Sequence, residues 1–266
     1  GFTQDDAHIF CTRDQILEEI VGVIDLTKSL LSVFGYTDYE VDLSVRDPEH
    51  PERYAGGAED WERAEESLRQ ALERTGLPAR RMPGEAVFYG PKIDIRMRDA
   101  IGRTWQCPTV QFDFNLPRRL DVTYTSPEGR EEPVVMIHRA IFGSLERFFG
   151  GLVEHYGGAF PVWLAPVQTI VLSITDRTRD YARQVGNTLR GEGIRVEVDD
   201  RNEKIGQKIR QAQMRKIPFM LVVGDREERE ATVSVRNRAR GDLGGFQLSE
   251  FLSHLRELID ARALAP

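Results

Sequence analysis

The chain has 266 residues, with 36 basic and 43 acidic side chains and a formal net charge of −7. Its 40% apolar and 30% charged residues are typical of a globular protein and exclude disorder, collagen and coiled coil as descriptions of the whole chain. No stretch approaches the ~20 consecutive apolar residues of a membrane span. Two cysteines, Cys11 and Cys107, are too few for a disulfide framework, so we expect a reducing, cytoplasmic setting.

The charge is unevenly distributed along the chain. Residues 1–166 carry 18 basic and 28 acidic side chains, whereas residues 167–266 carry 18 basic and 15 acidic ones. Within residues 201–240 the count is 11 basic to 5 acidic. A basic segment inside an acidic protein indicates either local polyanion binding or an ordinary solvated surface, and charge alone leaves both open.

The first 160 residues predict short strands with helices around them. Apolar residues at helical spacing predict helices over 13–34 and 60–75, and a further helix is expected over 139–156. Strict alternation in KIDIRMR indicates a half-buried antiparallel strand, and Pro108 inside a strand indicates an edge or a bulge. The pattern is α+β. The strands are expected at 86–90, 92–99, 103–116, 120–126 and 132–138.

After a joint marked by Pro161 and Pro166, strands and helices alternate. This order predicts a separate domain of about 100 residues, with a mostly parallel sheet flanked by helices. The strands are expected at 169–174, 194–200, 219–225 and 232–238, and the helices at 176–193, 203–216 and 248–262.

Two histidines stand at the ends of predicted strands. His8 opens a strand after the acidic pair Asp5–Asp6, and His138 ends the apolar run VVMI. Two imidazoles could supply half of a zinc site that keeps an open position for substrate. They could also be two unrelated structural histidines. The spacing by itself favours the structural alternative, because 130 residues separate them and no third ligand is evident.

Other polar residues suggest ligand contacts without proving them. Arg147 follows the small residues of GSLER, where a ligand can approach closely, and it could contact a phosphate, stack on a base or be an ordinary surface arginine. Gln106 and Thr109 cannot both be placed without the pairing register. In the second domain, one polar stripe of a helix, together with neighbouring cations, suits single-stranded RNA. The stripe is Lys204, Lys208, Gln211 and Arg215.

Five motifs in ordered spacing together resemble threonyl-tRNA synthetase, a class II aminoacyl-tRNA synthetase. They are GFTQDDAHIFC, FYGPKIDI, TWQCPTVQFDF, VMIHRAIFGSLERF and RNEKIGQKIR…IPFMLVVGD. The resemblance implies an antiparallel class II catalytic core, incomplete at its N-terminus, over residues 1–160. It also implies an α/β anticodon-binding domain with a mixed sheet over residues 161–266. The implied activity is ATP-dependent activation of threonine and its transfer to threonine tRNA by a cytoplasmic homodimer, with ATP and magnesium as substrate.

The resemblance also implies roles for individual residues. His8 and His138 match two zinc ligands, and Asp6 matches the carboxylate that orients the threonine hydroxyl. A site that ligates this hydroxyl rejects valine, because its polar groups would otherwise stay unpaired. The remaining catalytic positions are Gln4, Tyr89, Lys92, Gln106, Thr109, Gln111 and Arg147. The nucleotide positions are Gln106, Gln111, Ser144 and Arg147, and the RNA-reading positions are Asn202, Lys204, Arg210, Lys216, Glu227 and Arg236.

The sequence departs from the family pattern at its start. The cysteine ligand of zinc, motif 1 and the motif 2 arginine are expected upstream of Gly1, so we interpret the chain as part of a larger enzyme that is inactive alone. Editing of mischarged serine is expected elsewhere. The alternative is a non-catalytic tRNA-binding or regulatory paralogue, against which the intact Asp6, His8, His138 and Arg147 argue.

Overall fold

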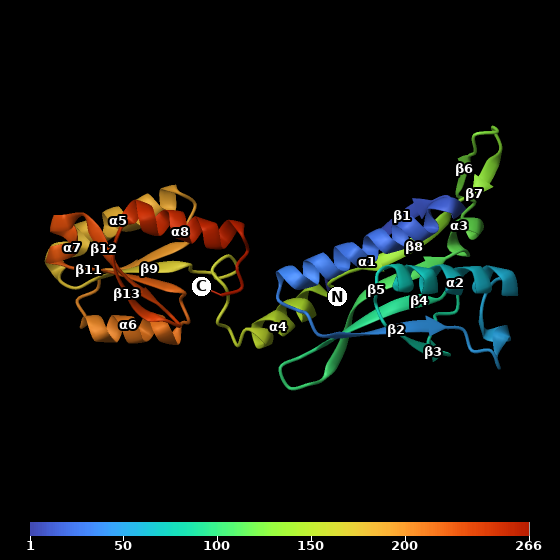
Figure 1. Cartoon of the computed structure of the whole chain (residues 1–266), viewed down its shortest axis with the longest axis horizontal. Helices are drawn as coiled ribbons and strands as arrows, with labels where there is room; N and C mark the ends of the chain where they lie inside the picture. The colour runs from blue at the N-terminus through green and yellow to red at the C-terminus, as the bar shows by residue number, and fades with distance from the viewer. Residues whose placement is uncertain (266) are drawn as a thin grey trace. The chain divides into compact units, whose positions relative to one another are not determined.

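Residues 1–155 fold around a six-stranded sheet in the computed structural model, which describes residues 1–265 (Figure 1). The strand order is β1-β8-β5-β4-β2-β3, and every neighbouring pair is antiparallel except the parallel pair β2 and β3. The strands are β1 (Ala7–Cys11), β2 (Tyr39–Val45), β3 (Arg80–Pro83), β4 (Lys92–Arg98), β5 (Thr104–Asp113) and β8 (Val135–Ala140). This antiparallel core agrees with the predicted α+β class.

Helices cover one face of this sheet. The helices α1 (Ile16–Val33) and α2 (Ala58–Arg74) lie side by side (Figure 1). The ring of Trp61 on α2 packs with its centroid 5.8 Å from that of Phe114, the residue after β5. Residues that alternate with the helix-facing ones lie on the opposite, open face. The unit is completed by α3 (Leu116–Arg119), the hairpin β6 (Thr123–Thr125) and β7 (Glu131–Pro133), and α4 (Leu145–His155).

Two sequence predictions for this unit were wrong, and one strand was missed. Residues 86–90 form a turn with an isolated bridge between Val87 and Gly90 instead of a strand. The edge strand β3 was missed, because a short segment ending in proline has no alternation to reveal it. The helix expected from Arg139 begins only at Leu145, because β8 continues through Ala140 and a turn follows.

The second unit, from Tyr156 onward, is built on a five-stranded mixed sheet. The order β10-β9-β11-β12-β13 is parallel across the first three strands and antiparallel after them. The strands are β9 (Thr169–Ser173), β10 (Val196–Asp199), β11 (Phe219–Val223), β12 (Thr232–Asn237) and β13 (Gly241–Gln247). The sequence missed β13, because the glycine-rich GDLGGFQ lacks any apolar alternation.

Helices flank this sheet on both faces (Figure 1). The helices α5 (Arg179–Gly191) and α8 (Leu248–Asp260) cover one face, where Val185 and Phe251 pack on alternate residues of β9, β11 and β12. The helix α6 (Ile205–Met214) covers the other face, with Ala212 against Leu172 and Met220. The short α7 (Asp225–Glu230), which was not predicted, follows β11. The division of the chain falls between His155 and Tyr156, five residues before the predicted joint.

Candidate active site and nucleic-acid interface

The predicted catalytic and nucleotide residues surround one cavity of about 660 Å³ on the open face of the first sheet. This volume lies in the range that encloses a small-molecule ligand. The predicted residues that line the cavity are Gln4, Asp6, Tyr89, Lys92, Gln106, Thr109, Gln111, His138, Ser144 and Arg147. Residues separated by up to 143 positions in the chain therefore meet in one place, although their roles stay predictions.

One row across the sheet brings four of the predicted residues together. Lys92 on β4 pairs with Gln111 on β5, Gln111 pairs with His138 on β8, and His138 pairs with His8 on β1. The two imidazole rings lie edge to face with centroids 4.6 Å apart. Directly opposite residues of an antiparallel pair have side chains on the same face. The register therefore determines that both histidines meet beside the cavity.

His138 is oriented by a carboxylate that the sequence analysis did not select. The Nε2 atom of His138 lies 2.9 Å from Oδ2 of the buried Asp113. Burial would raise the pKa of Asp113, but hydrogen bonds from His138 and from the backbone N–H groups of Leu116 and Asn115 hold it below its usual value. The only sequence signal was position: Asp113 follows Gln111 by two residues and so shares its face of β5.

A second buried carboxylate, Asp94, ties three predicted residues into a network. Its Oδ2 forms an ion pair with Lys92 Nζ at 2.7 Å and accepts a hydrogen bond from Ser44 Oγ at 3.0 Å. Its Oδ1 accepts from Thr109 Oγ1 at 3.1 Å and from the Gln106 amide. Asp94 is 3% exposed, so its charge is compensated within the protein. The sequence placed Asp94 on the polar face of its strand but gave no reason to single it out.

A bulge explains how Gln106 and Thr109 reach the same carboxylate. Asp94 pairs with Thr109 and Arg96 pairs with Gln106. Two residues of β5, Cys107 and Pro108, therefore lie opposite the single residue Ile95 of β4. With regular alternation, positions 106 and 109 would lie on opposite faces of the sheet. The extra residue brings both side chains to Asp94. Pro108 therefore marks a bulge, one of the two alternatives that the sequence indicated.

A third carboxylate, Asp5, holds the turn between β8 and α4. Its oxygens accept the backbone N–H groups of Ile141 at 2.9 Å, Phe142 at 3.1 Å and Gly143 at 3.0 Å. These bonds replace helical ones, which is why the helix begins later than predicted. Gly143 has a φ of +65°, and a Cβ there would lie 3.1 Å from the carbonyl oxygen of Cys107, so the turn requires glycine.

Arg147 lies in the first turn of α4, four residues after Gly143, and its side chain reaches back over the sheet. Its Nη2 donates to the carbonyl oxygen of Gln106 at 2.5 Å, and its guanidinium carbon lies 6.0 Å from the ring of Trp105. Trp105 is itself held by the Asp99 carboxylate, which accepts its Nε1–H at 2.8 Å. The hydrogen bonds from Trp105 and Arg103 lower the pKa of Asp99, although burial opposes them. The planar guanidinium stays exposed on the cavity side, where it can meet an anion or a ring.

In the second unit, three of the predicted RNA-reading residues follow the carboxyl ends of parallel strands. Asn202 and Lys204 lie after β10, and Glu227 lies after β11. In open α/β sheets this edge is where ligands bind. Arg236 lies on β12 opposite Met220, near the start of β11, and Lys216 lies just before β11. Arg210 is exposed on α6, so the six residues spread over more than one edge.

Two residues of this unit differ from their sequence interpretation. Lys208 was assigned to a polar helix stripe, but its side chain is 1% exposed and lies inside the unit. Glu227 is 6% exposed, and its carboxylate accepts the backbone N–H of Gly224 at 3.0 Å at the start of α7. Burial raises the pKa of Glu227, but the hydrogen bonds from Arg226 and Gly224 lower it overall. Its carboxylate thus has a structural task besides any contact with RNA.

Among residues 1–265, no group of three or more His, Cys, Asp or Glu side chains is placed to hold a metal ion. Cys11 and Cys107 are both buried and unpaired. None of the helices within the same residues is long and apolar enough to cross a bilayer.

Family models match both units. Residues 1–156 match the tRNA synthetase class II core domain (G, H, P, S and T), and residues 167–258 match an anticodon binding domain. The core match covers more than half of the chain and therefore shows the family.

Curated relatives and solved structures agree with these matches. The chain is 54% identical over 261 residues to a threonine–tRNA ligase of Clostridium tetani, covering 98% of this chain and 40% of the relative. It is 54% identical over 255 residues to the same-named protein of Nitrosococcus oceani, covering 96% and 39%. The chain thus spans about 40% of the length of these relatives.

Among solved structures, the RNA binding domain of threonyl-tRNA synthetase from Cryptosporidium parvum Iowa II superposes with a TM-score of 0.89 at 39% identity. That match covers 96% of this chain and 64% of the other. A putative threonyl-tRNA synthetase of Aeropyrum pernix gives a TM-score of 0.82 at 30% identity, covering 100% and 65%. The sequence resemblance is confirmed, and the chain belongs to the class II aminoacyl-tRNA synthetases, with a class II core domain followed by an anticodon-binding domain.

Proposed function

We propose that the protein takes part in the ATP-dependent activation of threonine and its transfer to threonine tRNA. The observation that carries this proposal is that one cavity brings together the residues expected to contact threonine and those expected to contact ATP. Gln4, Asp6 and Tyr89 line it together with His138 and Arg147. An adenylate joins an amino acid to a nucleotide, so a site that forms one must hold both partners together.

The histidine pair supports a zinc site at the amino-acid end. A metal-bound histidine usually donates its second ring N–H to a carboxylate, and Asp113 occupies that position beside Nε2 of His138. This arrangement leaves Nδ1 of His138 as the metal donor, with His8 facing it across the strand pair. When bound, zinc supplies coordination positions for the amino and hydroxyl groups of threonine. The carboxylate of Asp6, 3.9 Å from His8 Nε2, would then accept the hydroxyl proton.

Other residues that line the cavity suit ATP. Gln106 and Gln111 offer amides, Ser144 offers a hydroxyl, and Arg147 offers a planar cation for a phosphate or the adenine ring. The Asp5 carboxylate positions the turn that carries Ser144. In this arrangement the protein's residues bind and orient the two substrates, and proximity provides much of the rate acceleration.

Binding of stable adenylate analogues tests the active-site proposal on this chain. We expect the threonyl sulfamoyl-adenosine to bind at least about tenfold more tightly than the valyl one when Zn²⁺ is present, because only threonine offers the hydroxyl. The preference should vanish in His138→Asn and with EDTA. It should persist in His254→Asn, which changes a histidine of α8 in the other unit. Equal affinity for both analogues with Zn²⁺ present would sink the proposal. The isolated chain should show no threonine-dependent ATP–pyrophosphate exchange.

We further propose that the second unit binds the anticodon stem–loop of threonine tRNA. The basic segment 201–240 and the strand ends that carry Asn202 and Lys204 support this. Fluorescence anisotropy with a labelled stem–loop, at several salt concentrations, should give affinities that fall as salt rises. A stem–loop with a permuted anticodon is the matched control and should bind more weakly. Binding that ignores both salt and anticodon would contradict the proposal.

Expected assembly and location complete the proposal. The family resemblance implies a homodimer. Two buried cysteines without a disulfide fit a reducing cytosol. Size-exclusion chromatography with light scattering would measure the oligomeric state directly.

A further inference from the structure

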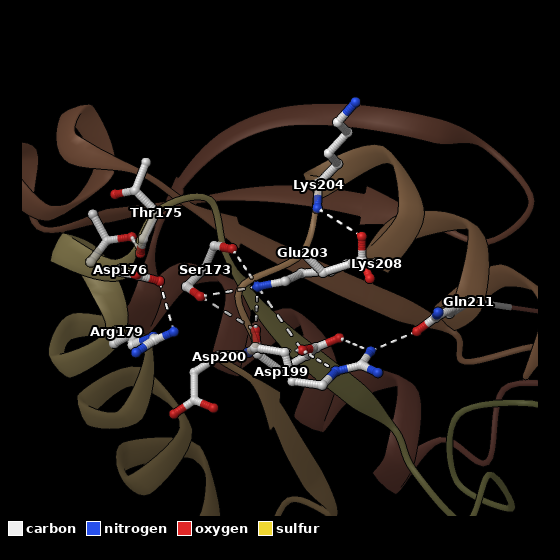
Figure 2. A network of polar contacts seen from close by, with 12 residues as sticks. Ser173, Thr175, Asp176, Arg179, Asp199, Asp200, Glu203, Lys204, Lys208 and Gln211 are labelled. Atoms are coloured by element: carbon white, nitrogen blue, oxygen red, sulfur yellow. Dashed lines mark hydrogen bonds and ion pairs between the residues drawn. The ribbon is translucent and has the colours of Figure 1, made fainter.

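The amine of Lys208 lies buried at the carboxyl ends of two parallel strands of the second unit (Figure 2). Its Nζ donates to the carbonyl oxygen of Ser173, the last residue of β9, at 2.8 Å and to that of Asp199, the last residue of β10, at 3.1 Å. A third contact joins it to Ser173 Oγ at 3.2 Å. A lysine amine has three protons, so every one has an acceptor.

Burying the Lys208 amine costs desolvation free energy. Burial lowers the pKa of Lys208, and the Asp199 carboxylate, 3.9 Å away, opposes that shift. An apolar side chain on the same helix face would avoid the desolvation of a cation, and such replacements are often neutral or stabilising. The apolar alternative would leave the two strand-end carbonyls without this donor. What the amine supplies is a fixed connection between β9, β10 and α6.

The connection continues into the loop that carries two predicted RNA-reading residues. The carboxylate of Asp199 accepts from Arg201 Nε at 2.9 Å and Nη2 at 2.7 Å, and Arg201 Nη2 also donates to Gln211 Oε1 at 2.6 Å. The hydrogen bond from Arg201 lowers the pKa of Asp199, so the carboxylate stays charged. Residues 200–204 therefore leave β10 in one defined path. Figure 2 shows Lys204 extending away from the network.

We propose that Lys208 is a positioning residue for RNA binding, which fixes the loop 200–204 so that Asn202 and Lys204 are held in place before RNA arrives. This inference rests on the proposed anticodon binding. A loop that is already ordered loses less conformational entropy when it binds, so its binding is tighter. Because Lys208 is buried, it contacts no phosphate itself. Its loss should lower affinity without changing the number of cations at the RNA.

The test measures stem–loop affinity of the full chain as a function of salt. We expect Lys208→Met to weaken binding about tenfold, from the ordering cost of two side chains. The slope of log K against log salt should stay unchanged, whereas Lys204→Met should reduce it by roughly 0.7–0.9 if Lys204 contacts one phosphate. Hydrogen exchange of residues 200–204 should accelerate in Lys208→Met. If this variant does not fold, Lys208→Gln, whose amide still donates to carbonyls, should show a smaller loss in the same direction.

Two control variants separate positioning from general effects. Arg190→Met removes one positive charge from α5, on the opposite face of the sheet, and should leave affinity almost unchanged. Leu255→Ala opens the core under α8 and should lower the melting temperature without weakening binding, when measured well below that temperature.

Each outcome decides between the alternatives. Unchanged affinity in a folded Lys208 variant, with only a lower melting temperature, would assign Lys208 to the core and overturn the inference. A reduced salt slope would make Lys208 a phosphate contact and overturn it too. If the unmodified chain binds no stem–loop, the proposed anticodon binding itself fails, and this inference fails with it.

Discussion

Removing the Asp94 carboxylate should strongly destabilise the first unit, residues 1–155. In Asp94→Ala, the amine of Lys92, whose side chain is 15% exposed, loses its partner at 2.7 Å. A charge-assisted hydrogen bond contributes about 1.5–3 kcal/mol and a neutral one about 1 kcal/mol. Ser44 is buried and cannot be rehydrated, whereas water reaches Gln106 and Thr109 through the cavity. We therefore expect a loss of about 3 kcal/mol in the free energy of unfolding.

Urea unfolding followed by tryptophan fluorescence can measure this loss in the correct unit. In a Trp163→Phe background the remaining tryptophans, Trp61 and Trp105, both belong to residues 1–155. This matters because two units need not unfold in one transition. Ser44→Ala is the matched control, since it removes one hydrogen bond to the same carboxylate and should cost about 1.5 kcal/mol. If Asp94→Ala costs no more than Ser44→Ala, the carboxylate is not the centre of the network and the reasoning is refuted.

Two further predictions follow from packing and burial. A Cβ at Gly90 would lie 1.9 Å from the carbonyl oxygen of Phe112, so Gly90→Ala should lower the free energy of unfolding by at least about 2 kcal/mol in the same urea assay. The control is Gly22→Ala, at an open position of α1, which should raise the free energy of unfolding by about 0.5–1 kcal/mol. Burial raises the pKa of Cys11 to about 11, with Glu19 adding to the shift, so at pH 8 iodoacetamide should alkylate it about a hundredfold more slowly in the native protein than in urea. Equal rates in both states would contradict the burial of this thiol.

The pKa of Cys11 also connects to stability. Its folded-state pKa lies above the ordinary value of 9.0, so folding favours the protonated thiol. The contribution is fully present below about pH 9 and is lost as the pH rises through about 11. Cys11→Ala should therefore reduce the fall in stability between these pH values.

Local patterns in the sequence determined most of the elements. Helical spacing of apolar residues predicted α1 and α2, and alternation predicted β4, because both periodicities are properties of neighbouring residues. Pro161 and Pro166 predicted a joint, and the structure divides the chain between His155 and Tyr156. The order of five motifs was enough to indicate the synthetase family, which the family models then showed.

The tertiary structure decided which residues meet. The pairing of His8 with His138 depends on strand register, and a shift by one residue would turn every side chain to the other face. The bulge at Cys107–Pro108 brings Gln106 to Asp94, and no local pattern reports that extra residue's partner.

The burial of polar side chains also could not be predicted from the sequence. Helical spacing groups Lys208 with Lys204 and Gln211 and so assigns it to the polar side of α6. Its amine is nevertheless buried, because the carbonyl oxygens at the ends of β9 and β10 provide acceptors just there. The acceptors of a buried lysine are set by how distant strands end side by side. Residue spacing determines the helix, but only the packed strands around it determine that this cation can be accommodated inside.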